Sequence, residues 1–307
     1  MSFIATTIIG LEKATAREVK GKFYSDGRVI FKDYNDEAFL TVDIVYELLA
    51  TFNFKNFSDL LDKVRKLDIN ISGTYKCLCK RYGDHDFTST IVEHDVGAII
   101  GAKGENLTYS KESAETIIFI DILNDTCSIG LLKKKDLSKR EYRFKLHNQT
   151  TPQLVASCLI KHLNINLEDS LLCLDCKDGV IPIEASLQGI KNITAQDIHQ
   201  NNIRNAKINA KLANKEINFT SKAIKDLTES CDYIIAQIIF SKEDRGPYNV
   251  INDILQAGNR LCKKEMAIIT NHPEDIETFR PESIKLKEQI KVQHKKQELI
   301  VLIYEKS

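Results

Sequence analysis

The second half of the chain alternates helical hydrophobic patterns with short, almost uninterrupted apolar runs. The runs lie at residues 171–174, 193–195, 217–219, 233–239, 266–269 and 299–304. Parallel strands that are buried on both faces show continuous apolar runs of this kind, and helices of roughly 10–15 residues connect them. The pattern therefore predicts a doubly wound α/β domain over residues 151–307. Its closing residues, 290–307, predict a strand pair that adds an antiparallel edge to the sheet.

The first half has a different rhythm, which predicts two smaller α+β units before a charged linker at 136–150. In residues 1–55, we expect strands from Phe3 and at 29–31, a turn near Gly27, and helical spacing through Val42, Val45, Leu48 and Leu49. In residues 56–135, we expect helices at 57–64 and 88–100 and strands at 74–79 and 116–123.

The charge balance restricts how this chain can bind nucleic acid. Lys and Arg together number 43, and so do Asp and Glu, so the formal net charge is zero. A histone-like polycation is excluded, and any nucleic-acid contact must come from a local basic face. No apolar run approaches the ~18 residues of a membrane span, and no basic leader with a cleavage site opens the sequence. We expect a cytoplasmic protein.

Eight cysteines suggest free thiols rather than a disulfide scaffold at this length. Cys77 and Cys79 lie two apart in a predicted strand, and Cys173 and Cys176 have the spacing of half a zinc site. Because no second matching pair accompanies them, small core residues are the better interpretation. We expect no metal.

Polar residues follow the first two predicted strands of the second half. Asp175 and Gly179 come after the first strand, and Asp197, 22 positions beyond Asp175, comes after the second. In doubly wound sheets the carboxyl ends of the strands bind ligands, and an acid at the second strand end can accept both ribose hydroxyls. The alternative for Asp197 is an N-cap of the following helix.

Several stretches resemble one known family, in that family's order and over nearly the whole chain. The motifs LLCLDCKDGVIPIEASL, AQDIHQNNIRNAKINAKLAN and DYIIAQIIFSKEDRG resemble those of Rossmann-fold, S-adenosylmethionine-dependent methyltransferases of the guanosine exocyclic amine in tRNA. The stretches at 73–100, 116–123 and 137–143 resemble their THUMP module, and residues 3–19 their ferredoxin-like N-terminal unit.

The resemblance implies a cofactor and a set of site residues. Asp175, Gly179 and Asp197 would bind S-adenosylmethionine, Phe240 would stack on a flipped guanine, and Gln237 would accept from its amine. The family has Asn-Pro-Pro-Tyr/Phe where this chain has Gln-Ile-Ile-Phe, and the first loop is shorter, with one glycine. At 221–223 the family's adenine-binding acid is missing, and Asp226 replaces it only if the register slips.

These departures leave a second interpretation open, a catalytically inactive RNA-binding relative that serves as a chaperone or as the partner of an active paralogue. Two isoleucines favour continuing the strand where two prolines would end it. A cavity between the Asp175 and Phe240 loops would favour the enzyme, and a filled one the inactive relative. A dinucleotide-dependent dehydrogenase is disfavoured because no G-x-G-x-x-G precedes the acid.

A basic stretch precedes the doubly wound domain. Residues 133–145 hold seven basic and two acidic residues, interleaved with Tyr142 and Phe144, and such a stretch can bind phosphates and stack on a base. A solvated linker is the alternative. The predicted RNA-binding residues are Arg81, Lys133, Lys134, Lys135, Lys139, Arg140 and Arg143.

A second RNA signal is the GxxG spacing at residues 101–104, which is typical of a KH loop. A plain turn explains the two glycines as well, and the flanking residues suit THUMP better. In either case the implied partner is RNA, and the family resemblance implies that this RNA is tRNA. The resemblance also leaves open a small activator subunit of the kind some relatives use.

Overall fold

The computed structural model describes residues 1–307 except 36–37, 105, 241–247, 295–296 and 307. The chain forms two compact units. The first comprises Met1–Thr6, Ile30–Asp36 and Asp43–Asp136, and the second comprises Thr7–Val29, Glu37–Val42 and Leu137–Ser307. Among the described residues, no helix combines the length and apolar character needed to cross a membrane.

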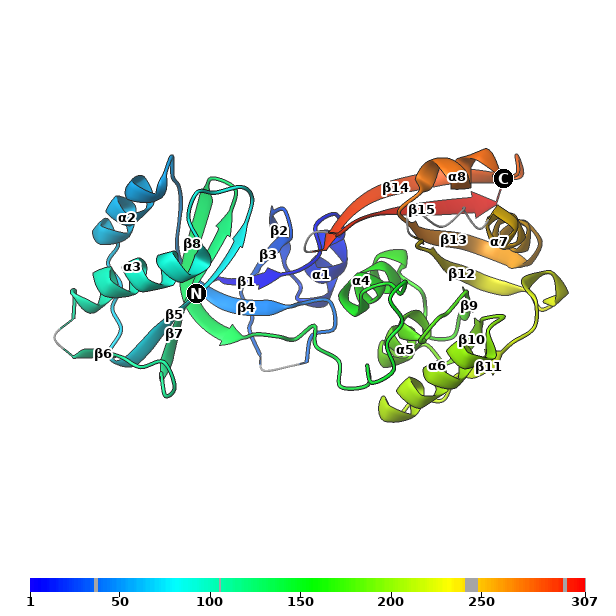
Figure 1. Ribbon diagram of the computed structural model, residues 1–307, viewed down its shortest axis with the longest axis horizontal. Coiled ribbons are helices and arrows are strands. Elements are labelled where there is room, and N and C mark those ends of the chain that lie inside the picture. The colour runs from blue at the N-terminus through cyan, green and yellow to red at the C-terminus, as the bar shows by residue number, and fades with distance from the viewer. Residues whose placement is uncertain (36–37, 105, 241–247, 295–296, 307) are drawn as a thin grey trace. The chain divides into compact units, whose positions relative to one another are not determined.

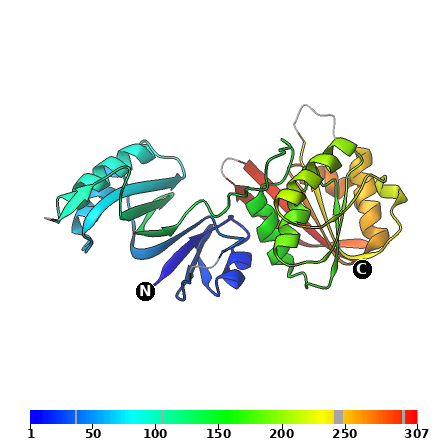
Figure 2. The same cartoon turned by 90° about the horizontal axis from the view of Figure 1, so that it is seen from below.

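The first unit is a sheet with helices on one face. The strands of this sheet, in spatial order, are β2 (Lys22–Ser25), β3 (Arg28–Phe31), β1 (Phe3–Thr6), β4 (Ile44–Asn53), β8 (Thr126–Lys134), β7 (Thr116–Leu123), β5 (Gly73–Tyr82) and β6 (Leu107–Tyr109). Helices α2 (Phe57–Lys66) and α3 (Ser89–Gly101) pack on this sheet (Figure 2). Asn56 and Thr88 cap them, each accepting a backbone N–H three residues on.

Alternation along the strands produces the core of this unit. Cys77 and Cys79 of β5 point to the same face as Ile118 and Ile120 of β7, and all four belong to the core beneath the helices. The four elements predicted for residues 56–135 are confirmed, with shifts of a few residues at their ends.

The helical spacing predicted through residues 42–49 is wrong, because Ile44–Asn53 is the long strand β4. It pairs with β1 on one side and β8 on the other. The pairing with β8 shifts register between Val45 and Tyr46 and again between Leu48 and Ala50. Each irregularity disturbs the two-residue alternation: Ile44, Val45 and Tyr46 are all buried, whereas Leu48 is half-buried and Leu49 is exposed.

The second unit is a doubly wound sheet. Its order is β11 (Asn218–Thr220), β10 (Asn192–Gln196), β9 (Ser170–Leu174), β12 (Cys231–Ile238), β13 (Cys262–Thr270), β15 (Gln297–Lys306) and β14 (Ile284–His294). The five strands from β11 to β13 are parallel, whereas β15 is antiparallel to both of its neighbours. The predicted fold class and antiparallel edge are confirmed.

Helices cover both faces of this sheet (Figures 1 and 2). Helices α4 (Gln153–Leu163), α5 (Val180–Leu187) and α6 (Gln200–Leu212) lie on one face, and α7 (Tyr248–Leu261) and α8 (Pro273–Thr278) on the other. Leu171 and Cys173 enter the first core, Leu172 and Leu174 the second. Burial on both sides explains why the strand is a continuous apolar run.

Two shorter elements also belong to this unit: α1 (Glu12–Glu18) and the 3₁₀ turn η1 (Ile224–Asp226). Arg17 of α1 donates to the carbonyls of Lys161 and His162 at the end of α4, at 3.2 and 3.1 Å.

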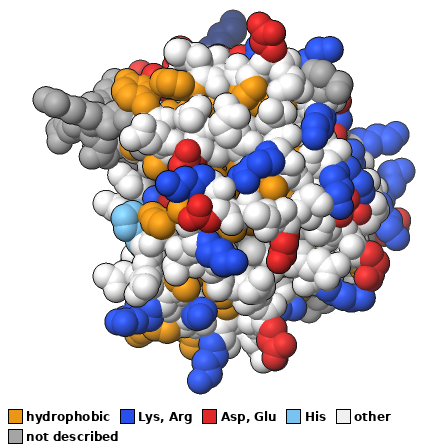
Figure 3. Space-filling view, turned by 90° about the vertical axis from the view of Figure 1, so that its right-hand side faces the viewer, with side chains coloured by type: hydrophobic (Ala, Val, Ile, Leu, Met, Phe, Trp, Pro, Cys, Tyr) orange, Lys and Arg blue, Asp and Glu red, His pale blue; other side chains and the backbone are white. Residues whose placement is uncertain are grey.

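On the face of the molecule in Figure 3, basic and acidic side chains lie intermixed. That mixture agrees with a net charge of zero.

Candidate functional site

A cavity of about 420 Å³ opens at the carboxyl ends of β9, β10 and β12. This is the place in the sheet where the strand order reverses, and doubly wound domains bind ligands there. The volume suits a small-molecule ligand. The lining residues are Gln149, Asp175, Lys177, Gln196, Ile198, His199, Ala223, Ile224, Ile238, Ile239, Phe240, Val250 and Asp253. A cavity thus exists between the Asp175 and Phe240 loops.

Asp197 lies behind the cavity wall, with 0% of its surface exposed. Its Oδ2 accepts from the Lys177 backbone and from the Asn202 amide, both at 3.0 Å, and its Oδ1 accepts from the His199 backbone at 2.9 Å. The N-cap position of α6 is His199, not Asp197. The Asp197 carboxylate therefore joins the first loop to the start of α6.

The loop after β9 has an unusual backbone. Asp175, Lys177 and Gly179 have φ of +53°, +51° and +85°, a conformation that costs non-glycine residues roughly 1–2 kcal/mol each. Two hydrogen bonds hold the backbone of this loop. The Cys176 N–H donates to the Gln196 carbonyl of β10 at 2.9 Å, and the Lys177 N–H donates to the Asp197 carboxylate. A strained backbone of this kind persists only where contacts with the surrounding structure fix its conformation.

Asp175 and Lys177 form an ion pair of 2.8 Å on the cavity wall. Burial raises the pKa of Asp175, the ammonium of Lys177 opposes that rise, and the neighbouring Asp197 carboxylate adds to it. The cavity therefore presents a paired cation and anion on this wall.

Gly179 is required by packing inside the protein. A Cβ at this position would lie 2.9 Å from the Cβ of Ala206 in α6, and the positive φ also favours glycine. Gly179 does not line the cavity. Its role as a cofactor contact stays a prediction.

Gln237 sits at the end of β12, fully buried. Its Oε1 accepts from the backbone N–H of Thr151 at 2.7 Å and from its hydroxyl at 2.9 Å, while Nε2 donates to the Asp175 carbonyl at 3.0 Å. Both ends of the carboxamide are thus bonded within the protein. The strand continues through Ile238, in register with Thr270 of β13.

Phe240 lines the cavity with 8% of its surface exposed. Its ring stacks on His272, with centroids 3.9 Å apart and planes 5° from parallel. The Asn271 side chain accepts from the Phe240 N–H at 3.3 Å and donates to its carbonyl at 2.8 Å. An aromatic ring is therefore held at the cavity, with one face covered by His272.

Asp226 does not replace the third-strand acid that the sequence lacks at 221–223. Ala223 and Ile224 line the cavity, whereas Asp226 is exposed in η1 and does not. Five polar lining residues were not among the predicted site residues: Gln149, Lys177, Gln196, His199 and Asp253. His199 follows Asp197 by two positions and could have been found from that spacing, but nothing local marked Gln149 or Asp253.

The cavity has room for S-adenosylmethionine, but the side chains as they stand do not fit it in the predicted roles. Asp197 offers no exposed oxygen to a ribose, and Gln237 offers no unbonded amide oxygen to a guanine amine. No chemical step through the cofactor follows from this arrangement.

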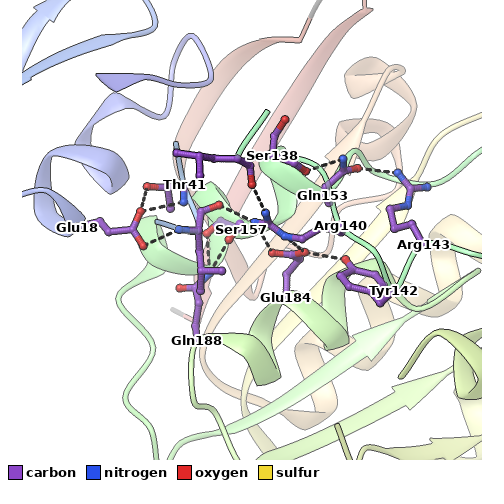
Figure 4. A network of polar contacts seen from close by, with 12 residues as sticks. Glu18, Thr41, Ser138, Arg140, Tyr142, Arg143, Gln153, Ser157, Glu184 and Gln188 are labelled. Atoms are coloured by element: carbon purple, nitrogen blue, oxygen red, sulfur yellow. Dashed lines mark hydrogen bonds and ion pairs between the residues drawn. The ribbon is translucent and has the colours of Figure 1, made fainter. Parts of the chain in front are cut away.

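The basic linker folds onto the second unit. Arg140 forms a bidentate pair with Glu184 of α5, at 2.8 and 3.2 Å, and also donates to the carbonyls of Leu137 and Leu40 (Figure 4). The Tyr142 hydroxyl donates to Glu184 at 2.7 Å. The Arg140 side chain is 8% exposed and that of Glu184 is 0% exposed. Arg140 therefore lies inside this network.

Arg143 has similar partners. Its guanidinium donates to Gln153 at 2.6 Å and to Asp178 at 3.3 Å, and the side chain is 18% exposed. Asp178 also accepts from the Thr150 hydroxyl and the His147 backbone. These contacts hold the linker against the loop after β9.

The other predicted RNA contacts lie nearer the surface. Lys133 pairs with Glu47 at 2.9 Å, while Lys135 and Lys139 are exposed. Arg81 donates to His85 at 3.0 Å and lies over the ring of Phe87 at 5.7 Å. Nothing in these contacts tests RNA binding, which stays a prediction for this group and for Lys134.

The GxxG segment is a turn after α3. Lys103 donates to the carbonyls of Val64 and Leu67 at the end of α2, at 3.0 Å for Val64. A Cβ on Gly101 would collide with the hydroxyl of Tyr75, which donates to the Gly97 carbonyl. Both roles are internal to the first unit, as a plain turn requires.

Residues 54–132 match the THUMP domain model. The chain carries a THUMP domain. Over 213 residues it is 24% identical to the tRNA (guanine(6)-N2)-methyltransferase of Archaeoglobus fulgidus, an alignment that covers 62% of this chain and 54% of that protein. The chain thus spans about half the length of that relative.

Solved structures of other proteins share the fold of this chain. TrmN from Thermus thermophilus superposes with a TM-score of 0.78 at 18% identity, covering 100% of this chain and 99% of TrmN. SMU.472, solved with SAH, gives 0.77 at 16% identity over 100% and 98%. The resemblance to THUMP-domain tRNA guanosine-N2 methyltransferases that the sequence predicted is confirmed.

Proposed function

We propose that this chain binds structured tRNA. The observation that carries the proposal is the THUMP domain at residues 54–132, in a chain that shares the fold of TrmN over its whole length. The named relative from Archaeoglobus fulgidus acts on tRNA. Arg81, Lys133, Lys134, Lys135 and Lys139 are the proposed contacts, because cationic side chains bind phosphates without reading sequence.

Fluorescence anisotropy with a labelled tRNA transcript tests this function. We expect saturable binding to folded tRNA, and weaker binding to a single-stranded DNA of equal length. Equal affinity for both would contradict recognition of structured RNA, and absence of binding at low salt would end the proposal.

Methyl transfer to the guanine exocyclic amine is the first candidate for the activity of the second unit. The named relative and the cavity support it, and SMU.472 supports S-adenosylmethionine as the cofactor. Asp175, Gly179 and Asp197 are the proposed cofactor contacts, and Gln237 and Phe240 the proposed base contacts. In this candidate Asp197 and Gln237 exchange internal hydrogen bonds for ligand bonds.

A non-catalytic RNA-binding role is the second candidate. The observation that favours it is the complete internal use of the Gln237 carboxamide. Breaking these bonds would leave buried groups unpaired, at a cost of about 1–3 kcal/mol each.

Two measurements separate the candidates. Calorimetry with S-adenosylmethionine at millimolar concentration shows binding if the cavity takes the cofactor. Mass spectrometry of tRNA nucleosides from a deletion strain then reports activity: loss of one methylguanosine supports methyl transfer. No binding heat together with an unchanged nucleoside profile supports the non-catalytic role.

The proposal keeps the predicted context. It places the protein in the cytoplasm and leaves room for a small activator subunit. It also keeps the predicted boundaries 1–55, 56–135, 136–150 and 151–307. Co-purification from the native cell would identify a subunit that binds in a fixed ratio.

A further inference from the structure

Four basic residues follow one another along α6 and just beyond its end. We call Arg204, Lys207, Lys211 and Lys215 the α6 stripe. Spacings of three and four place Arg204, Lys207 and Lys211 on one side of the helix, and Lys215 follows three residues after the helix ends at Leu212. The opposite side of α6 is buried through Ile203, Ala206 and Ala210. The stripe therefore faces away from the core.

The α6 stripe has no neutralising partner among the described residues, where none of its four side chains forms an ion pair. Other lysines of the same unit do form such pairs, as Lys191 does with Glu168 at 2.7 Å and Lys264 with Asp169 at 2.6 Å. Like charges at helical spacing repel one another. A polyanion that neutralises them would remove this repulsion.

A groove of about 600 Å³ runs beside the stripe. Its lining includes three cations and one carboxylate, from Lys207, Lys211, Lys215 and Glu216, and the apolar side chains of Ile217 and Phe219. Both apolar residues are half-buried. A basic edge that follows the backbone, beside apolar and aromatic groups, is the usual chemistry of single-stranded nucleic-acid binding.

The segment that carries the exposed Phe144 is hydrogen-bonded to a buried residue of the same helix. Phe144 is 69% exposed, and the ammonium of Lys145 lies 5.2 Å from its ring centroid. The fully buried Asn209 of α6 fixes this segment: it accepts from the Lys145 N–H at 2.9 Å and donates to the Lys145 carbonyl at 2.7 Å. A rigid backbone thus presents an exposed ring and a cation together.

We propose that the α6 stripe, its groove and Phe144 form an RNA-binding surface on the second unit. The lysines bind the sugar-phosphate backbone of a tRNA strand, and Phe144 stacks on an unpaired base. This inference rests on the proposed tRNA binding and adds a surface that lies outside both the THUMP domain and the cavity. It also moves the basic contacts of this unit from Arg140 and Arg143, whose guanidinium groups are bonded internally, to α6.

The test compares two full-length variants with the same loss of charge. The stripe variant is K207Q/K211Q/K215Q. The control is K191Q/K264Q/K291Q, whose lysines pair with carboxylates on the same unit. Affinity for labelled tRNA is measured by anisotropy at several salt concentrations.

We expect the stripe variant to lose about tenfold or more in affinity, and the slope of log K against log salt to become shallower by about 2. The control should stay within about twofold of the unsubstituted chain. Urea unfolding of both variants verifies that they are folded, and relief of repulsion should leave the stripe variant at least as stable.

Phe144→Ala tests the stacking contact, with Phe23→Ala as its match, since Phe23 is also exposed, at 62%. We expect about tenfold weaker tRNA binding for the first and no change for the second. The salt slope should remain the same for both, because neither substitution removes a charge.

The outcomes separate the two proposals. If the unsubstituted chain does not bind tRNA, the proposed function fails. If it binds and the stripe variant binds equally well, only this inference fails. Competition by polyglutamate at the concentration of competing RNA would also overturn the inference, because it would indicate an acidic polypeptide as the ligand.

Discussion

Asp197, which the sequence predicted as a ligand contact, accepts hydrogen bonds from other parts of the protein instead. Three donors from two elements converge on it in a site without solvent exposure. Hydrogen bonds to a charged acceptor contribute more than neutral ones, and losing the acceptor leaves buried donors unpaired. Its residue type was predictable from sequence, but its partners were not.

Asp197→Ala should lower the free energy of unfolding of the second unit by about 2–4 kcal/mol, because its donors lose their acceptor. Urea unfolding monitored by circular dichroism measures this loss. Asp226→Ala, at an exposed aspartate in η1, is the matched control and should change stability by less than about 0.5 kcal/mol. A similar small effect for both would show that the Asp197 network contributes little.

The thiols of the first unit predict a pH dependence. Burial raises the pKa of Cys77 and of Cys79 to about 12. Unfolded thiols ionise near pH 8.5, so the folded state holds protons that the unfolded state releases. Stability is therefore fully present below that pH and falls as the pH rises toward 12.

Unfolding of the chain in urea at pH 8, 9 and 10 measures this fall. The slope should approach 1.4 kcal/mol per pH unit for each buried thiol. A C77A/C79A double variant should show a flatter dependence, and an unchanged slope in that variant would refute the assignment.

At the scale of elements, the segment from Leu137 to Thr150 acts as a strap across the second unit. Arg140 and Tyr142 bind Glu184 (Figure 4), and Arg143 binds Asp178, so buried charges are paired and hydrogen-bonded. The sequence shows a basic stretch with aromatic residues, which both a linker and an RNA contact would have. Only tertiary contacts distinguish the buried Arg140 and Tyr142 from the exposed Phe144.

Arg140→Ala should destabilise the second unit by about 3–5 kcal/mol, because it leaves the Glu184 carboxylate buried and without its cation. Lys191→Ala removes an exposed pair with Glu168 and should cost less than about 1 kcal/mol. Denaturant midpoints of the two variants give the comparison, and equal midpoints would contradict the role of the strap.

At the scale of the whole molecule, a net charge of zero makes RNA binding depend on local surfaces. Long-range attraction from the whole chain is absent, so affinity comes from the few phosphates in direct contact. We expect the affinity for tRNA to fall by roughly one to two orders of magnitude between 50 and 200 mM salt. Anisotropy titrations measure it, and a salt-independent affinity would exclude phosphate contacts.

The sequence by itself determined the doubly wound sheet, because strands buried on both faces must be apolar at every position, and that requirement is local. It also determined the THUMP resemblance, which the motif order carries. Tertiary structure alone decided the strand at Ile44–Asn53, where bulges against β8 disturb the alternation. It also decided the partners of Gln237, whose hydrogen-bonded neighbour Thr151 lies 86 residues away. Hydrogen bonds over such separations depend on how the chain folds back, and no local pattern records that.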